Sequence, residues 1–98
     1  MNKGVYITKK IQKAIKEGYN RFWFELDEEI EGSYLEFVLQ ENFTLKAYSD
    51  AIFIANYDGK IPVNEIFVPV SNIKGIEARL IRDDNTFKNK VVYTSRGV

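Results

Sequence analysis

The stretch RFWFELDEEIEGSYLEFVLQ, residues 21–40, decides the fold of this chain. Apolar side chains recur at every second position on both sides of a polar turn at residues 31–33. Before the turn they are Phe22, Phe24 and Leu26, and after it they are Leu35, Phe37 and Leu39. A period of two is typical of strands that bury one face. The stretch therefore predicts an antiparallel hairpin with one apolar face.

The residues before this hairpin have a helical period instead. The apolar positions fall on one stripe, namely Ile7, Ile11, Ala14 and Ile15. The lysines fall on the other side, namely Lys9, Lys10, Lys13 and Lys16. We predict a helix over residues 8–17 with Thr8 as its N-cap, ended by Gly18 in the left-handed conformation.

Alternation resumes after the hairpin and continues to the end of the chain. The further predicted strands cover residues 43–47, 51–57, 65–70, 76–82 and 88–94. Asp58-Gly59 is the strongest turn signal, Pro62 predicts a loop or edge, and Pro69 predicts an edge, a bulge or a strand end. The pattern predicts a single α+β domain over residues 1–98. Its strands, about six, form a small antiparallel β meander, as a barrel or roll, with one N-terminal helix.

The composition limits the chemistry of this chain. It has 98 residues, 45% of them apolar, and no His or Cys. Without these residues there is no thiolate nucleophile, no His base and no soft metal ligand. The carboxylate run at residues 27–31 lacks the ligand spacing of a calcium-binding EF-hand loop. We expect a protein that is not an enzyme and that uses no cofactor and no metal.

Charge is unevenly distributed along the chain, although fourteen cationic side chains balance fourteen anionic ones. Residues 1–21 carry six cationic side chains and one carboxylate, whereas residues 25–65 carry ten carboxylates and two lysines. Residues 66–98 carry six cationic side chains and three carboxylates. The chain is therefore a dipolar molecule whose binding depends on local surfaces rather than on its net charge.

The hairpin register places aromatic and acidic side chains together on the face away from the core. This predicted protein-binding set is Trp23, Glu25, Asp27, Tyr34 and Glu36. Aromatic anchors surrounded by carboxylates suit a basic protein surface. We expect an adaptor or inhibitor that binds such a surface, with mimicry of nucleic acid by a protein from a mobile element as one form of it. Two simpler interpretations stay open: the charges form an ordinary solvated face, or Trp23 packs inside the protein.

The alternative function is single-stranded nucleic-acid binding by a small barrel. The basic helix and the late hairpin would supply its contacts, namely Lys9, Lys10, Lys13, Lys16, Arg79 and Arg82. A homo-oligomer that joins acidic surface to basic surface is a third option. No secretory signal or membrane-length apolar run is present, so the expected location is the cytoplasm, with no membrane partner.

Overall fold

The computed structural model describes residues 2–26 and 34–95 of the chain, and it contains one α-helix and seven strands. The elements are α1 (Lys3–Lys16), β1 (Arg21–Leu26), β2 (Tyr34–Val38), β3 (Phe43–Ala47), β4 (Ala51–Asp58), β5 (Ile61–Pro69), the 3-10 turn η1 (Val70–Asn72), β6 (Ile73–Ile81) and β7 (Phe87–Thr94). The predicted α+β class, with antiparallel strands and one N-terminal helix, is confirmed.

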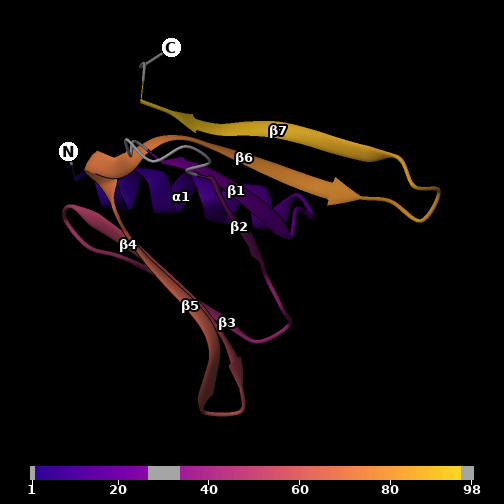
Figure 1. The fold of residues 1–98 in the computed structure, drawn as a ribbon, viewed down its shortest axis with the longest axis horizontal. Helices are drawn as coiled ribbons and strands as arrows, with labels where there is room; N and C mark the ends of the chain where they lie inside the picture. Colours follow the sequence, from indigo (N-terminus) through magenta and orange to yellow (C-terminus); the bar gives the residue numbers. More distant parts are fainter. Residues whose placement is uncertain (1, 27–33, 96–98) are drawn as a thin grey trace.

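The strands form two antiparallel sheets (Figure 1). The first has the order β2-β1-β6-β7 and the second has the order β3-β4-β5. Consecutive strands pair as hairpins in both sheets, as expected of a meander, but β1 also pairs with β6 far along the chain. The strands described here therefore form two sheets rather than one continuous meander, and they close no barrel.

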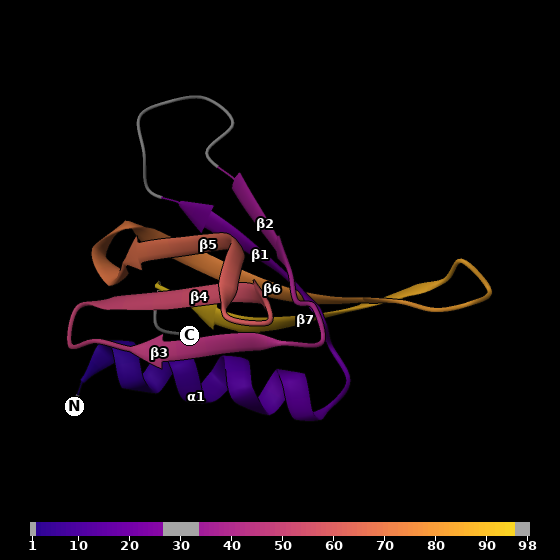
Figure 2. The ribbon, with the colours of Figure 1, turned by 90° about the horizontal axis from the view of Figure 1, so that it is seen from below.

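The core lies between the two sheets and α1, which packs against β3, β4 and β7 (Figure 2). The predicted helical stripe is buried at Ile7, Ile11 and Ala14, and the predicted strand face is buried at Phe22 and Phe24. Because these side chains alternate with polar ones, each element presents only one face to the core. The period of the sequence thus identified the buried faces of the helix and of the first strand.

The prediction that Thr8 caps the helix is wrong, because α1 begins at Lys3 and Thr8 is buried within it. Asn2 is the N-cap, and its side chain accepts a hydrogen bond from the backbone N–H of Val5. Gly4 lies in the first turn, where a Cβ would come within 1.9 Å of the backbone carbonyl oxygen of Tyr48. Glycine is therefore needed here for close packing, although glycine has a low helix propensity.

The predicted end of the helix is confirmed, since Gly18 adopts a φ of 100°. The fifth strand after the helix, β5, differs more from its prediction than the helix end does. β5 begins at Ile61 rather than at residue 65, and Pro62 lies inside it near a bulge. This is possible because β5 is the edge strand of its sheet, where a residue without an N–H is tolerated.

A buried asparagine connects the two sheets. Asn56 on β4 is fully buried, and its side-chain oxygen accepts from the Gln40 N–H at 2.9 Å. Its amide nitrogen donates to the carbonyl of Val38 at 2.8 Å and to the side chain of Asn64 at 2.9 Å. All of the donors of this amide are used, so its burial is compensated and the end of β2 is fixed against β4.

The hairpin of β6 and β7 projects beyond the rest of the molecule in both views (Figures 1 and 2). Its outer part, residues 81–89, is exposed along its whole length. Among the described residues, no helix has both the length and the apolar character to cross a membrane.

Candidate functional site

The candidate site is the face of the four-stranded sheet that points away from the core. On β1, Phe22 and Phe24 face the core, so the alternate residues Trp23 and Glu25 face outward. Pairing carries this face across the sheet, because Trp23 lies opposite Glu36 of β2 and opposite Glu77 of β6. We call this surface the Trp23 face; its outward side chains are Arg21, Trp23, Glu25, Tyr34, Glu36, Glu77, Arg79 and Val91.

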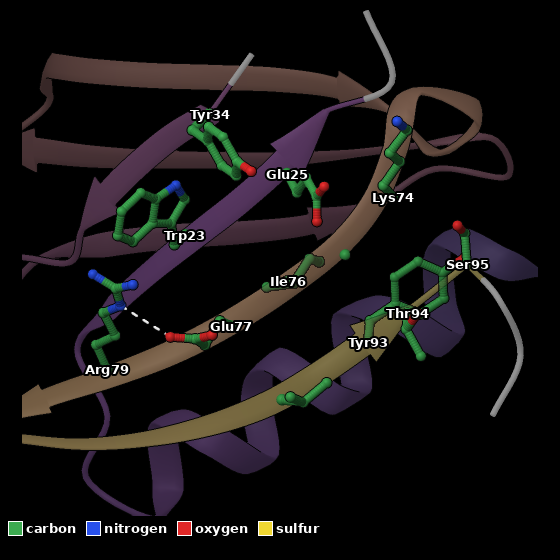
Figure 3. Close-up of a pocket in the computed structure, with 12 residues that line it drawn as sticks. Trp23, Glu25, Tyr34, Lys74, Ile76, Glu77, Arg79, Tyr93, Thr94 and Ser95 are labelled. Atoms are coloured by element: carbon green, nitrogen blue, oxygen red, sulfur yellow. Dashed lines mark hydrogen bonds and ion pairs between the residues drawn. The ribbon is translucent and has the colours of Figure 1, made fainter. Parts of the chain in front are cut away.

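Trp23 is half-buried at the centre of this face, covered by two neighbours. The guanidinium carbon of Arg79 lies 3.7 Å from the centroid of the indole ring, a cation–π contact. The Tyr34 ring meets the indole edge-to-face with centroids 5.6 Å apart, and the side of the indole that carries its nitrogen faces Tyr34 (Figure 3). The indole N–H is buried and has no hydrogen-bond partner among the described residues. Packing therefore holds Trp23 in place.

Tyr34 provides the accessible aromatic surface, since 58% of the residue is exposed. Its position on the edge strand β2 leaves one side of the ring open. Together the two rings present an apolar platform bordered by polar side chains. A partner can remove water from such a platform at a small cost in free energy. Aromatic anchors in protein interfaces are desolvated in the same way.

Opposite charges alternate on the Trp23 face. Arg21 pairs with Glu36 at 3.3 Å, and Arg79 pairs with Glu77 at 3.0 Å. All four side chains are about one-third exposed or more, so these pairs contribute little to stability and can exchange partners. Glu25 has no ion pair or hydrogen bond with any described residue. The described part of this face is thus mixed in charge rather than uniformly acidic.

An open pocket of about 800 Å³ lies on this face, between β1 and the ends of β6 and β7 (Figure 3). Trp23, Glu25 and Tyr34 form one side of it, while Lys74, Tyr93 and Ser95 lie on the other. The volume falls in the range of small-ligand and peptide sites. Gly75 of β6 also lines the pocket, opposite Glu25 of β1.

Four of the five predicted protein-binding residues lie together on the Trp23 face: Trp23, Glu25, Tyr34 and Glu36. Asp27 lies outside the described residues. The interpretation that Trp23 packs inside is wrong, because β1 turns its other face to the core and Trp23 meets Arg79 and Tyr34 instead.

The residues predicted for nucleic-acid binding do not share one surface. The four helix lysines are exposed on α1: Lys9, Lys10, Lys13 and Lys16. Arg79 lies instead on the Trp23 face, and Arg82 lies in the exposed outer part of the β6–β7 hairpin. Near the end of the helix, Lys90 pairs with Glu17 and Lys88 lies over the Tyr19 ring. Arg79 and Arg82 thus lie apart from the lysine-bearing surface of α1.

Local sequence patterns did not indicate that β6 and β7 contribute to the site. Glu77 and Arg79 reach Trp23 only because β6 pairs with β1, about fifty residues earlier in the chain. Alternation identified which β6 residues share a face, but it does not identify the partner strand. The pairing of β1 with β6 is the information that the sequence pattern lacked.

Two carboxyl groups of the described residues, on Glu17 and Asp84, have lowered pKa values. A hydrogen bond from Lys90 lowers the pKa of Glu17, and hydrogen bonds from Thr86 lower the pKa of Asp84. Both carboxyl groups are at the surface. Within residues 2–26 and 34–95, no group of three or more acidic side chains is arranged to hold a metal ion.

Comparison with known proteins gives no further assignment. No protein-family model matches this chain, and no curated protein or solved structure is significantly similar to it. The function proposed below therefore depends on the geometry of the Trp23 face and on the sequence.

Proposed function

We propose that this protein is a non-enzymatic binding module, an adaptor or inhibitor, that engages a basic protein surface through the Trp23 face. The observation that supports this most directly is the placement of the single tryptophan. Trp23 lies at the centre of an outward sheet face, beside the exposed ring of Tyr34 and above an open pocket. A protein that had no partner for this face would gain more stability by burying its largest apolar side chain in the core.

The polarity of the partner follows from the carboxylates on this face. Glu25 has no partner among the described residues, and Glu36 and Glu77 are held only by exposed ion pairs. A lysine or arginine of a partner can therefore pair with Glu25 without displacing another cation. The sequence adds to this preference, because four of the five residues that follow Leu26 are acidic.

These carboxylates disfavour a polyanionic ligand at the same face. A nucleic acid would have to approach Glu25, Glu36 and Glu77, and each like-charge approach costs free energy in a desolvated contact. Arg21 and Arg79 offset part of this repulsion, but both already pair with carboxylates. A protein partner can place its cations next to the carboxylates and its apolar groups on the two rings.

The test is quantitative capture of binding proteins by three forms of the full chain. The forms are the wild type, a double variant Trp23→Ala/Glu25→Lys, and a control double variant Lys9→Glu/Lys13→Glu on α1. We expect the proteins that the wild type captures to be captured also by the helix variant but not by the Trp23 variant. The Kd of each form is then measured with the purified partner. Equal capture by the wild type and the Trp23 variant, each shown to be folded, would contradict the proposal.

A further inference from the structure

β2 is an unprotected edge of the four-stranded sheet, directly beside Trp23. It pairs with β1 on one side only, and no strand among the described residues pairs with its other side. β2 runs from Tyr34 to Val38 and contains no proline. Its outward side chains, Tyr34 and Glu36, belong to the Trp23 face. A strand added to this edge would therefore place alternate side chains on that face.

The hydrogen bonds next to β2 show which of its backbone groups are available. The Leu39 N–H donates to the Asn20 carbonyl at 2.8 Å, so Leu39 points its backbone groups toward β1. Backbone groups alternate in direction along a strand, and Phe37 and Leu35 therefore also bond to β1. It follows that the N–H and C=O of Glu36 point away from the sheet, as does the carbonyl of Val38.

The outward Val38 carbonyl accepts a hydrogen bond, whereas the outward N–H and C=O of Glu36 form none with a described residue. Asn56 donates to the Val38 carbonyl, which confirms the outward direction derived from the pairing. No hydrogen bond to the outward N–H or C=O of Glu36 is formed within the described part of the chain. Glu36 thus offers one donor and one acceptor at the free edge, next to the aromatic platform.

The other sheet edges are protected in the usual ways. β5 contains Pro62 and Pro69, and prolines hinder the addition of a further strand. α1 packs against β3 and against β7, the two remaining edge strands, although the outer part of β7 stays exposed. β2 contains no proline and is not among the strands against which α1 packs, and its Tyr34 and Glu36 belong to the Trp23 face.

We propose that the partner of the Trp23 face is an extended basic peptide segment that pairs with β2 as a fifth strand. This inference rests on the proposed function and adds its recognition mode. The Glu36 N–H and C=O would bond to the segment's backbone, and the Glu36 carboxylate would face a lysine or arginine directly opposite it. Two residues along, the segment would place an apolar side chain against the Tyr34 ring.

The test uses peptides selected on the full-length protein from a random library of linear 12-residue sequences. Two variants separate the backbone contact from the side-chain contact: Glu36→Ala keeps the N–H, and Glu36→Pro removes it. Because this N–H is not used by β1, proline at this edge position is compatible with the sheet. We expect Glu36→Ala to weaken peptide binding by up to about fivefold, and Glu36→Pro by at least about tenfold relative to Glu36→Ala.

A second measurement does not depend on the folding of the proline variant. N-methylation of the selected peptide at alternate residues removes its backbone donors on one edge or on the other. Binding should be lost for one of the two methylation patterns and kept for the other. The selected sequences should also carry a lysine or arginine at one fixed position.

The outcomes separate this inference from the proposed function. If Trp23→Ala abolishes binding while Glu36→Pro and both methylation patterns leave it unchanged, strand addition is wrong and the Trp23 face stands. If the library gives no binder, strand addition is also wrong, and the capture experiment decides the function independently. Binding that survives both Trp23→Ala and Glu36→Pro would overturn both proposals.

Discussion

The side-chain amide of Asn56 on β4 donates a 2.8 Å hydrogen bond to the backbone carbonyl of Val38 at the end of β2. This contact joins the three-stranded sheet to the sheet that carries the Trp23 face. The same side chain accepts from the Gln40 N–H, so it holds the segment that connects β2 to β3 at two points. One buried amide therefore fixes the end of β2, whose length is paired with β1.

Replacing this amide should destabilise the fold. Asn56→Ala leaves the Gln40 N–H and the Val38 carbonyl without their partner, and it also opens a small cavity. We expect a loss of about 2 to 4 kcal/mol in the free energy of unfolding, measured by urea denaturation. Asn89→Ala is the matched control, because Asn89 is exposed on β7 and its side chain is not part of the Asn56 hydrogen bonds, so it should cost less than about 1 kcal/mol. Similar losses in both variants would show that Asn56 has no special role.

The close approach at Gly4 leads to a second prediction. A Cβ at this position would meet the carbonyl oxygen of Tyr48 at 1.9 Å and that of Ala51 at 2.9 Å, and neither backbone atom can move aside easily. Gly4→Ala should therefore lower the free energy of unfolding by about 1 to 3 kcal/mol, despite the better helix propensity of alanine. Val5→Ala at the exposed neighbouring position should change it by less than about 0.5 kcal/mol. A Gly4→Ala protein as stable as the wild type would contradict the packing of α1 on the β3–β4 turn.

Gly4 also illustrates where sequence patterns succeed and where they fail. The isoleucine stripe and the alternation in residues 21–26 identify the buried faces, because each depends on a local period. The start of α1 was misplaced, because the prediction makes Thr8 the N-cap, and the close contact of Gly4 with a backbone forty-four residues away leaves no local pattern. Likewise, four members of the candidate site follow from the hairpin register, whereas Glu77 and Arg79 require the pairing of β1 with β6.

The ion pair between Glu17 and Lys90 should make stability depend on pH. The Lys90 hydrogen bond lowers the pKa of Glu17 below its ordinary value of 4.5, so the folded state favours the charged form. The contribution is therefore fully present above pH 4.5 and is lost as the pH falls through the lower pKa of the folded state. Comparing urea denaturation of the wild type and Glu17→Gln between pH 7 and pH 3, we expect the advantage of the wild type to shrink toward the acid end. Because Glu17 is at the surface, added salt should weaken the effect as well. A difference that does not change with pH would show that the pair does not form in solution.

The contact between Arg79 and Trp23 can be measured directly, because the chain has one tryptophan. The guanidinium covers the indole at 3.7 Å, so Arg79→Ala should expose the ring to water and shift its fluorescence emission to longer wavelength. Iodide should then quench the emission more strongly. Arg21→Ala is the matched control, since Arg21 lies on the same strand face and pairs with Glu36 instead. An unchanged spectrum in Arg79→Ala would mean that the guanidinium does not rest on the indole.

If the shift occurs, a partner at this face either displaces Arg79 or contacts the Tyr34 side of the platform. Those two modes differ in one observable: displacement predicts tighter binding by Arg79→Ala, whereas contact through Tyr34 predicts that Tyr34→Ala weakens binding and Arg79→Ala does not strengthen it.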